Sequence, residues 1–380
     1  MTDKIRRVIG LGFDGKPIFA PWPAAHSLLL AAAGSRKTTS GAVPWLLSLI
    51  EDRERAIIVN DAKDGEIAAQ CAGLCRTYGR KVAIIDDFAV LGRDNPYAVS
   101  LTPLGSVVAA YQAANGELVF AAENANHALI SDPPDDARNQ YWRDEPRSII
   151  EFAMRSLLKR DSSLVTPGGI WGLIADTNTL LSAARIEVEE GDEVLAALAS
   201  HILDMREHDK EHDGQHRGAA LKALRIYSAD SPLHRAGADA FLTHAELIRE
   251  KYIIFIVGPQ RHMARLGPHY ALHLQSFVEA TLTGRAGPVH YILDEFTNAP
   301  LKALIGALTT MRGYGGTCHM IAQSRSEIQR RYGEKETATI EENAVVKQWF
   351  GFSSFEEAER VSRAMGEGMT DEGSRTDRLN

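Results

Sequence analysis

Apolar runs that alternate with helical patterns occupy the two ends of the sequence. Near the amino terminus, three short runs at residues 28–33, 55–60 and 81–86 have the pattern of buried strands. The segments between them, 41–51 and 67–78, carry apolar side chains at helical spacing. Helical connections of about a dozen residues between apolar strands are typical of right-handed βαβ crossovers. The sequence therefore predicts a mostly parallel sheet with helices on its faces.

The middle of the chain, residues 101–245, differs in character because it carries many charges and few strand patterns. Its helical patterns cover residues 118–132, 139–159, 194–210 and 218–226. Strand patterns resume at residues 251–257, 289–294, 318–323 and 345–350, separated by helical patterns at 269–283 and 301–314. We interpret residues 101–245 as an all-α lobe inserted into one α/β domain.

The two halves of this α/β domain are predicted at residues 1–100 and 246–366. Its lead-in, residues 1–25, is rich in Gly and Pro, which favours a short β-hairpin or an irregular segment. Residues 367–380 are Gly-rich and charged, and we expect them to form a flexible tail.

Composition places the chain among ordinary soluble proteins. It has 380 residues, of which 44% are hydrophobic and 24% charged, enough for a large core and two lobes. The longest apolar runs are far below the roughly 18 to 20 residues that span a bilayer, and the amino terminus lacks the apolar core of a signal peptide. We expect a cytoplasmic protein. The net charge of −8 excludes a surface that is basic all over, although a local basic groove fits it.

The three cysteines do not make a disulfide framework, in agreement with a reducing compartment. Cys71 and Cys75 are one helical turn apart, but no second ligand pair follows at zinc-site spacing, so we expect them to be structural. His208, His212 and His216 also share a helical spacing. Because Gly214 lies between the last two and the neighbours alternate in charge, we interpret them as a solvated helix end.

The first strand leads into a turn that resembles a phosphate-binding loop. In the pattern G-x-x-x-x-G-K-[ST], backbone N–H groups surround the phosphates, the lysine reaches the outer phosphates, and the hydroxyl ligates Mg²⁺. Lys37 and Thr38 fill the last two positions, whereas Ala31 and Arg36 replace the two glycines. The predicted nucleotide-binding residues are Gly34, Ser35, Arg36, Lys37, Thr38 and Thr39.

Paired carboxylates end a later strand, in the segment YILDEF at residues 291–296. At the carboxyl end of a buried strand, Asp294 is placed to hold Mg²⁺ and Glu295 to orient the attacking water. An apolar run that ends in Asp-Glu is also typical of a simple strand-end cap. The upstream Lys37 and Thr38 favour the Walker B interpretation, with Thr38 and Asp294 as the metal-binding residues.

Two further polar residues flank the next strand. Gln323 ends it and is predicted to sense the γ-phosphate, although a hydrogen-bonded strand-end glutamine has the same pattern. Arg312 lies 11 residues before Gln323. It is predicted to be an arginine finger that enters a neighbouring subunit's site, and the alternative is a solvated helix arginine.

The ensemble resembles the TraG/TraD-like coupling ATPases of type IV secretion and conjugation systems. The resemblance covers residues 26–366, with a weaker middle. The motifs that carry it, in chain order, are HSLLLAAAGSRKTTSGAVPWLL, VNDAKDGEIA, DNPYAVS, YILDEFTNAP, MRGYGGTCHMIAQSRSEIQRRYG and ENAVVKQWFGFSSFEEAERVSRAMG.

The resemblance implies a RecA-like P-loop NTPase domain with an all-α lobe, which binds ATP and Mg²⁺ and assembles into a ring of six subunits around a DNA-carrying channel. It implies catalytic roles for Glu295, Arg312 and Gln323. It also implies as partners single-stranded DNA, a relaxase or effector protein and the inner-membrane components of the secretion system, at the cytoplasmic face of the bacterial inner membrane.

Two features depart from the family pattern. Members usually carry a transmembrane anchor before the motor domain, and we interpret this chain as a naturally soluble relative or as the part that follows the anchor. The second is Arg36, which stands where a glycine lets the backbone approach the phosphates.

Three hypotheses of function follow. The first is an ATP-driven motor that moves single-stranded DNA or a protein–DNA substrate toward a secretion channel. The second, motivated by Arg36, is a nucleotide-binding adaptor that docks relaxase or effector cargo with weak or no hydrolysis. The third is another RecA-like motor, such as one for DNA packaging, which does not account for the resemblance over residues 312–333.

Overall fold

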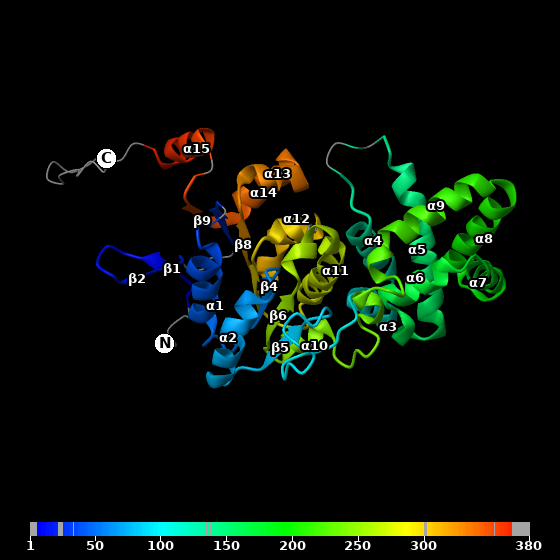
Figure 1. The fold of residues 1–380 in the computed structure, drawn as a ribbon, viewed down its shortest axis with the longest axis horizontal. Helices are drawn as coiled ribbons and strands as arrows, with labels where there is room; N and C mark the ends of the chain where they lie inside the picture. Colours follow the sequence, from blue (N-terminus) through cyan, green and yellow to red (C-terminus); the bar gives the residue numbers. More distant parts are fainter. Residues whose placement is uncertain are drawn as a thin grey trace.

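The computed structural model describes residues 6–21, 26–32, 34–133, 136, 138–299, 302–352 and 354–366. Figure 1 shows an elongated molecule with the sheet in one half, helices α5 to α9 gathered at the far end, and α3, α4 and α11 between them. The predicted tail at residues 367–380 lies outside the described residues.

Seven parallel strands form the central sheet, in the order β5-β6-β4-β7-β8-β3-β9. All strands of this sheet except β9 are almost fully buried, as expected for a parallel sheet that is covered on both faces. The bounds are β3 His26–Ala31, β4 Ala56–Asp61, β5 Val82–Ile85, β6 Ile253–Val257, β7 Val289–Leu293, β8 Gly316–Ala322 and β9 Ala344–Phe350. Each corresponds to a predicted apolar run, and the RecA-like α/β fold class is confirmed.

Alternate side chains of the strands pack into two separate cores. On one face, Leu29, Val59 and Ile84 pack with helices α1 (Val43–Leu49) and α2 (Glu66–Thr77). On the other face, Leu28 and Ile58 belong to a larger core that includes α10, α11 and α12 and continues into the helices beyond the sheet. This two-sided covering follows from the period-two geometry of a strand.

Among the described residues between β5 and β6, all regular elements are helical. Their bounds are α3 Gly105–Ala113, α4 Leu118–Leu129, α5 Tyr141–Arg160, α6 Pro167–Ala175, α7 Thr177–Glu190, α8 Glu193–His208, α9 Lys210–Ala223 and α10 His244–Arg249. Helix α5 packs against α4, α6, α8 and α9, while α3 and α4 pack against α11 (Met263–Leu282) of the sheet part. The exact boundary of the predicted lobe at residues 101–245 stays a prediction.

The remaining helices surround the carboxyl-terminal strands. They are α12 Lys302–Thr310, α13 Arg325–Tyr332, α14 Glu334–Asn343 and α15 Phe355–Met365. At the other end of the chain, β1 (Val8–Leu11) and β2 (Pro17–Phe19) form an antiparallel pair, which matches the hairpin alternative for the lead-in. No helix in the described ranges combines the length and the apolar character that crossing a bilayer requires.

The interpretation of the histidine segment was wrong. Helix α9 continues through Gly214, and the break lies at Asp209, whose carboxylate caps α9 by accepting a hydrogen bond from the His212 amide at 3.2 Å. His216 is fully buried, and its ring packs edge-on against Tyr141, with 5.3 Å between the centroids. A glycine inside a helix costs only about 1 kcal/mol, which the packing of this aromatic cluster outweighs.

Arg80 ties together the turns at the amino ends of β4, β5 and β6. Its buried guanidinium donates to the carbonyl oxygens of Ile50 and Asp52 at 2.9 Å, of Arg55 at 2.8 Å and of Lys251 at 3.0 Å. These four carbonyl groups lie outside the strands. The Arg80 guanidinium donates the hydrogen bonds that water would otherwise donate to them.

We expect Arg80→Met to lower the free energy of unfolding by about 3 kcal/mol or more, because it leaves several buried carbonyl groups without donors. Urea unfolding followed by circular dichroism measures the change. The control is Arg53→Met, since Arg53 also donates to carbonyl oxygens, those of Tyr78 and Gly79, but from an exposed position. A change within about 0.5 kcal/mol is expected there. Equal losses in the two variants would contradict this account.

Candidate functional site

The strand order brings the predicted site residues to one edge of the sheet. The adjoining strands β4, β7, β8 and β3 are parallel, so their carboxyl ends meet at the same edge. Lys37 and Thr38 follow β3, the pair Asp294 and Glu295 follows β7, and Gln323 follows β8. A fourth strand end, that of β4, adds Lys63. Ligands of open parallel sheets bind at this edge.

The described part of the loop after β3 turns sharply and leads into a helix. Gly34 has φ of 79° and Arg36 has φ of 59°, both in the left-handed region. The Arg36 carbonyl accepts a hydrogen bond from the Ser40 amide at 2.8 Å, and the chain enters a π-helical turn, Thr38–Ala42, that continues into α1. Ala33 of the same loop lies outside the described residues.

Arg36 does not fill the loop. Its side chain is exposed, whereas Lys37 and Thr38 beside it are buried. The departure from the glycine pattern therefore costs backbone energy, about 1 kcal/mol or more for an L-residue at positive φ.

Five side chains make up what we call the strand-end centre: Lys37, Thr38, Lys63, Asp294 and Glu295. The Lys37 Nζ lies 2.9 Å from Glu295 Oε1, and the Thr38 hydroxyl donates to Asp294 Oδ2 at 3.0 Å. The Lys63 Nζ donates to the Thr38 oxygen at 3.0 Å and lies 3.4 Å from Asp294 and 3.3 Å from Glu295. Two cations and two carboxylates thus balance in a mostly buried space.

Neighbouring amides fix the position of the Glu295 carboxylate. Glu295 has φ of 51°, which turns the chain sharply after β7. Its Oε2 accepts a hydrogen bond from Asn298 Nδ2 at 3.1 Å and a long one from Gln323 Nε2 at 3.5 Å. From the other side, Asn60 Nδ2 donates to the Asp294 carbonyl at 3.0 Å and fixes the backbone between the two acids.

The two paired carboxyl groups differ in pKa because their surroundings differ. Burial raises the pKa of Asp294 more than Lys63 and the Thr38 hydroxyl lower it. Burial also raises the pKa of Glu295, but its bonds to Lys37 and Lys63 outweigh that effect and hold its pKa below the usual value. Glu295 is therefore ionised at neutral pH, as a residue that orients and deprotonates water must be.

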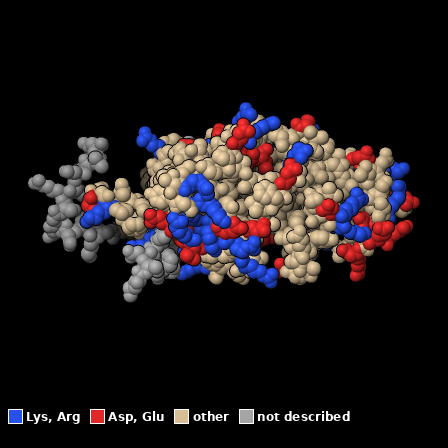
Figure 2. All heavy atoms as spheres, turned by 90° about the horizontal axis from the view of Figure 1, so that it is seen from below, with Lys and Arg blue, Asp and Glu red and all other residues tan. Residues whose placement is uncertain are grey.

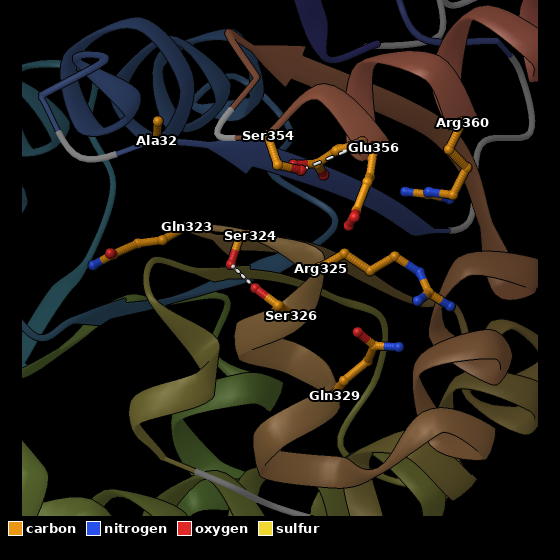
Figure 3. A pocket seen from close by; sticks show the side chains of 10 residues that line it. Ala32, Gln323, Ser324, Arg325, Ser326, Gln329, Ser354, Glu356 and Arg360 are labelled. Carbon is orange, nitrogen blue, oxygen red and sulfur yellow. Dashed lines mark hydrogen bonds between the residues drawn. The ribbon is translucent and has the colours of Figure 1, made fainter.

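A polar pocket of about 570 Å³ adjoins this centre. Figure 3 shows that it lies between the P-loop side, where Ala32 and Gln323 are found, and the helices that carry Arg325 and Arg360. Both arginines are ion-paired with Glu341, at 3.1 Å and 3.0 Å. The other lining residues are Ser324, Ser326, Gln329, Ser354, Glu356 and Glu357.

Arg312 is not brought to the strand-end centre of its own chain. It is exposed on the turn Met311–Tyr314, immediately before β8, whereas Gln323 follows the other end of that strand. Seven extended residues separate the two ends by roughly 20 Å. Within one chain, Arg312 thus contacts neither Lys37 nor Glu295.

Sequence reasoning missed Lys63, Asn60 and Asn298 as members or supports of the centre. Lys63 and Asn60 lie in the segment VNDAKDGEIA, whose polar residues at a strand end were a usable signal. Asn298 was hidden because it reaches Glu295 only after the sharp turn at positive φ, which a sequence pattern does not reveal.

The comparisons with known proteins agree with this geometry. Residues 288–379 match a family model described as the TraM recognition site of TraD and TraG. No curated protein matches the sequence. Among solved structures, the bacterial conjugative coupling protein TrwBdeltaN70, in a trigonal form with sulphate, is 14% identical with a TM-score of 0.64, over 92% of this chain and 79% of that one.

Two other solved structures extend the likeness. The plasmid coupling protein TrwB in complex with ADP and Mg²⁺ is 16% identical with a TM-score of 0.60, over 88% of this chain and 71% of that one. VirB4 of Thermoanaerobacter pseudethanolicus is 15% identical with a TM-score of 0.51, over 97% and 90%. The structural matches show the shared fold.

The buried carboxyl group of Asp61, at the end of β4, makes the free energy of unfolding depend on pH. Burial and the charge of Asp294 raise its pKa to about 7, despite a hydrogen bond from the Ala68 amide at 2.8 Å. In the unfolded chain its pKa is about 3.9. Between these values the folded state binds more protons, so Asp61 makes stability fall as pH rises.

We expect Asp61→Asn, which resembles the protonated acid, to remove this contribution. Relative to the variant, the unmodified protein loses on the order of 1 kcal/mol of unfolding free energy per pH unit between about pH 4 and 7. Urea unfolding at a series of pH values, without nucleotide, measures the difference. A difference that stays constant over this range would show that Asp61 is ionised at all these pH values.

Proposed function

We propose that the chain is an ATP-dependent coupling protein, because its sequence resembles the TraG/TraD-like coupling proteins and its carboxyl-terminal part matches a family model of TraD and TraG. In this proposal it moves single-stranded DNA, or a protein–DNA substrate, toward a type IV secretion channel. The observation that carries the proposal is the strand-end centre, where a P-loop lysine and threonine meet two strand-end carboxylates at bonding distance.

The residues of the centre fit a nucleotide with Mg²⁺. Asp294 Oδ1 and the Ser35 hydroxyl are buried without a hydrogen-bond partner among the described residues. The Thr38 hydroxyl and Asp294 Oδ2 are already 3.0 Å apart, as two oxygen ligands of one cation would be. When bound, Mg²⁺ would neutralise charge on the β- and γ-phosphates. The solved TrwB structures include complexes with ADP and Mg²⁺ and with a non-hydrolysable ATP analogue, which supports the same ligands here.

Lys37 and Glu295 exchange partners in the proposed reaction. In the nucleotide-free arrangement, Lys37 Nζ pairs with the Glu295 carboxylate. Lys37 would pair with phosphate oxygens instead of Glu295. The loss of this cation would raise the pKa of Glu295 toward that of an effective general base. Asn298 and Gln323 hold the Glu295 carboxylate so that it orients the attacking water.

Arg312 would complete the site of a neighbouring copy. It is exposed and far from the centre of its own chain, which is what a residue acting in trans requires. An arginine that stabilises charge in the transition state makes turnover depend on assembly. We propose a hexameric ring in which each subunit receives Arg312 from the next.

The charge distribution is compatible with a DNA substrate despite the net charge of −8. Figure 2 shows a group of Lys and Arg side chains over the half of the molecule that holds the sheet, with some Asp and Glu side chains among them, and both signs also at the lobe end. Local basic surface attracts the phosphate backbone, and its contribution falls as salt concentration rises. The carboxyl-terminal match to a recognition site for a partner protein supports the docking of a relaxosome component.

The experiment that tests the function is Glu295→Gln. We expect at least about a 100-fold loss of DNA-stimulated phosphate release, because the amide cannot accept the proton from water, with nucleotide affinity changed only a few-fold. Phosphate release with and without single-stranded DNA, and calorimetric titration with Mg·ATP, give the two quantities.

The matched control is Glu250→Gln, which makes the same charge change at the opposite edge of the sheet, where Glu250 is paired with Lys81 at 2.7 Å. Its phosphate release should equal that of the unmodified protein. Undiminished turnover in Glu295→Gln would refute the proposed role of Glu295 and, with it, the hydrolytic motor.

The adaptor is the second proposal, and one specific observation favours it. Arg36 stands in the loop where the family pattern has a glycine, and the Lys37–Glu295 pair closes the centre, so nucleotide must displace this pair to bind. An adaptor would dock relaxase or effector cargo with weak or no hydrolysis.

The substitution Arg36→Gly separates the two proposals. Since the Arg36 side chain is exposed and its φ of 59° is already adopted without nucleotide, we expect affinity for Mg·ATP to change only a few-fold, with hydrolysis measurable in both proteins. Calorimetric titration and phosphate release are compared side by side. Hydrolysis that appears only in the glycine variant would instead support the adaptor.

A further inference from the structure

A second cluster of metal-binding side chains lies away from the strand-end centre. Asp87, just after β5, faces His269 and His273, which are one turn apart on α11. Both His Nε2 atoms point to the same oxygen, Asp87 Oδ2, at 3.0 Å and 3.4 Å. The three ligand atoms all lie within 4.8 Å of one another.

The spacing of these atoms matches a tetrahedral metal ion. With bonds of about 2.0 to 2.1 Å, as for Zn²⁺ with nitrogen or oxygen ligands, two ligand atoms of a tetrahedron are roughly 3.3 Å apart. The two Nε2 to Oδ2 distances lie on either side of this value. Two histidines at positions i and i+4 of one helix face the same way, so the helix itself provides the spacing.

The outer partners of the two rings are also in place. Nδ1 of His269 lies 3.3 Å from the Tyr227 hydroxyl, and Nδ1 of His273 lies 3.2 Å from His244 Nε2. Both partners can accept a hydrogen bond, so each ligating ring can carry its proton on Nδ1 and leave the Nε2 lone pair for a metal. Gly105 leaves room for this arrangement, since a Cβ there would collide with the His244 ring.

The two rings and the carboxylate differ in their access to solvent. Both histidine side chains are at most 1% exposed, whereas that of Asp87 is 12% exposed and gives an ion access from solvent.

We propose that Asp87, His269 and His273 form a binding site for a divalent transition-metal ion of the zinc class, with water as the fourth ligand. Two imidazoles and one carboxylate select such an ion over Mg²⁺, which prefers oxygen ligands. The site is separate from the nucleotide: β6 lies between β5 and β4, so roughly 10 Å separates the ends of those two strands.

The site would hold three segments of the chain together. Asp87 follows β5, the two histidines lie on α11 of the sheet part, and the outer partners Tyr227 and His244 belong to the helices that precede β6. A metal ion here fixes these three segments to one another. Its energetic effect is a gain in stability of the folded chain that depends on the concentration of free ion.

Direct measurement of metal binding tests the proposal. The purified full chain is freed of metal with a chelator and titrated with Zn²⁺ by calorimetry, without nucleotide and in excess Mg²⁺. We expect one ion per chain and a higher melting temperature. Asp87→Asn and His273→Gln should each weaken binding on the order of 100-fold, and Tyr227→Phe, which removes an outer partner, about 10-fold.

His212→Ala is the matched control, because His212 belongs to the histidine-rich surface of α8 and α9 and pairs with Asp209 rather than with this cluster. It should bind Zn²⁺ like the unmodified protein. Loss of binding in His212→Ala with unchanged binding in Asp87→Asn would overturn the proposal, as would a folded unmodified protein that binds no ion stoichiometrically.

If a variant fails to fold, X-ray absorption of the zinc-loaded unmodified protein decides the question. Two imidazole rings and two oxygen ligands support the site. A spectrum without two imidazoles, or one with thiolate ligands, refutes it.

Discussion

The ion-pair network at the carboxyl ends of β3, β7 and β4 is the constraint on which the rest of the structure depends. Lys37, Lys63, Asp294 and Glu295 are mostly buried, and each would be costly there without the others. Their meeting requires that three strands from distant parts of the sequence end at the same level. The apolar strands and the two cores around them provide that alignment. The fold therefore brings together charged groups, each of which would be costly to bury without its partners.

The neutral balance of this network also explains why it can respond to a ligand. Two lysines match two carboxylates, and Asp61, at the end of β4, has a pKa raised to about 7 by burial and by the charge of Asp294. A polyanion that takes Lys37 from Glu295 leaves a carboxylate with fewer cations beside it. In the function proposed above, the same step would bind phosphate and raise the pKa of Glu295.

Much of the fold could be predicted from the sequence because a parallel sheet buried on both faces needs continuous apolar strands, and all strands but the edge strand β9, which contains Lys347 and Gln348, are apolar and almost fully buried. The site was predictable where its residues follow strands directly, as for Asp294 and Gln323. The cluster of Asp87, His269 and His273 was not, since more than 180 residues separate its parts and the predicted helix began at residue 269 instead of Met263. The effect of Arg36 was equally hidden, because it depends on φ and on exposure rather than on residue type.

The two polar clusters lie at the same edge of the sheet but have different consequences for motion. The strand-end centre lies among β4, β7, β8 and β3, where ligand exchange changes its pairing. The Asp87 cluster lies at the end of β5, where the chain leaves the sheet for the helices. The chain returns to the sheet just after His244, which contacts the same cluster through His273. The hydrogen bonds of this cluster therefore fix the segment after β5 relative to α10 and α11, because buried directional bonds restrict the relative positions of the groups that they join.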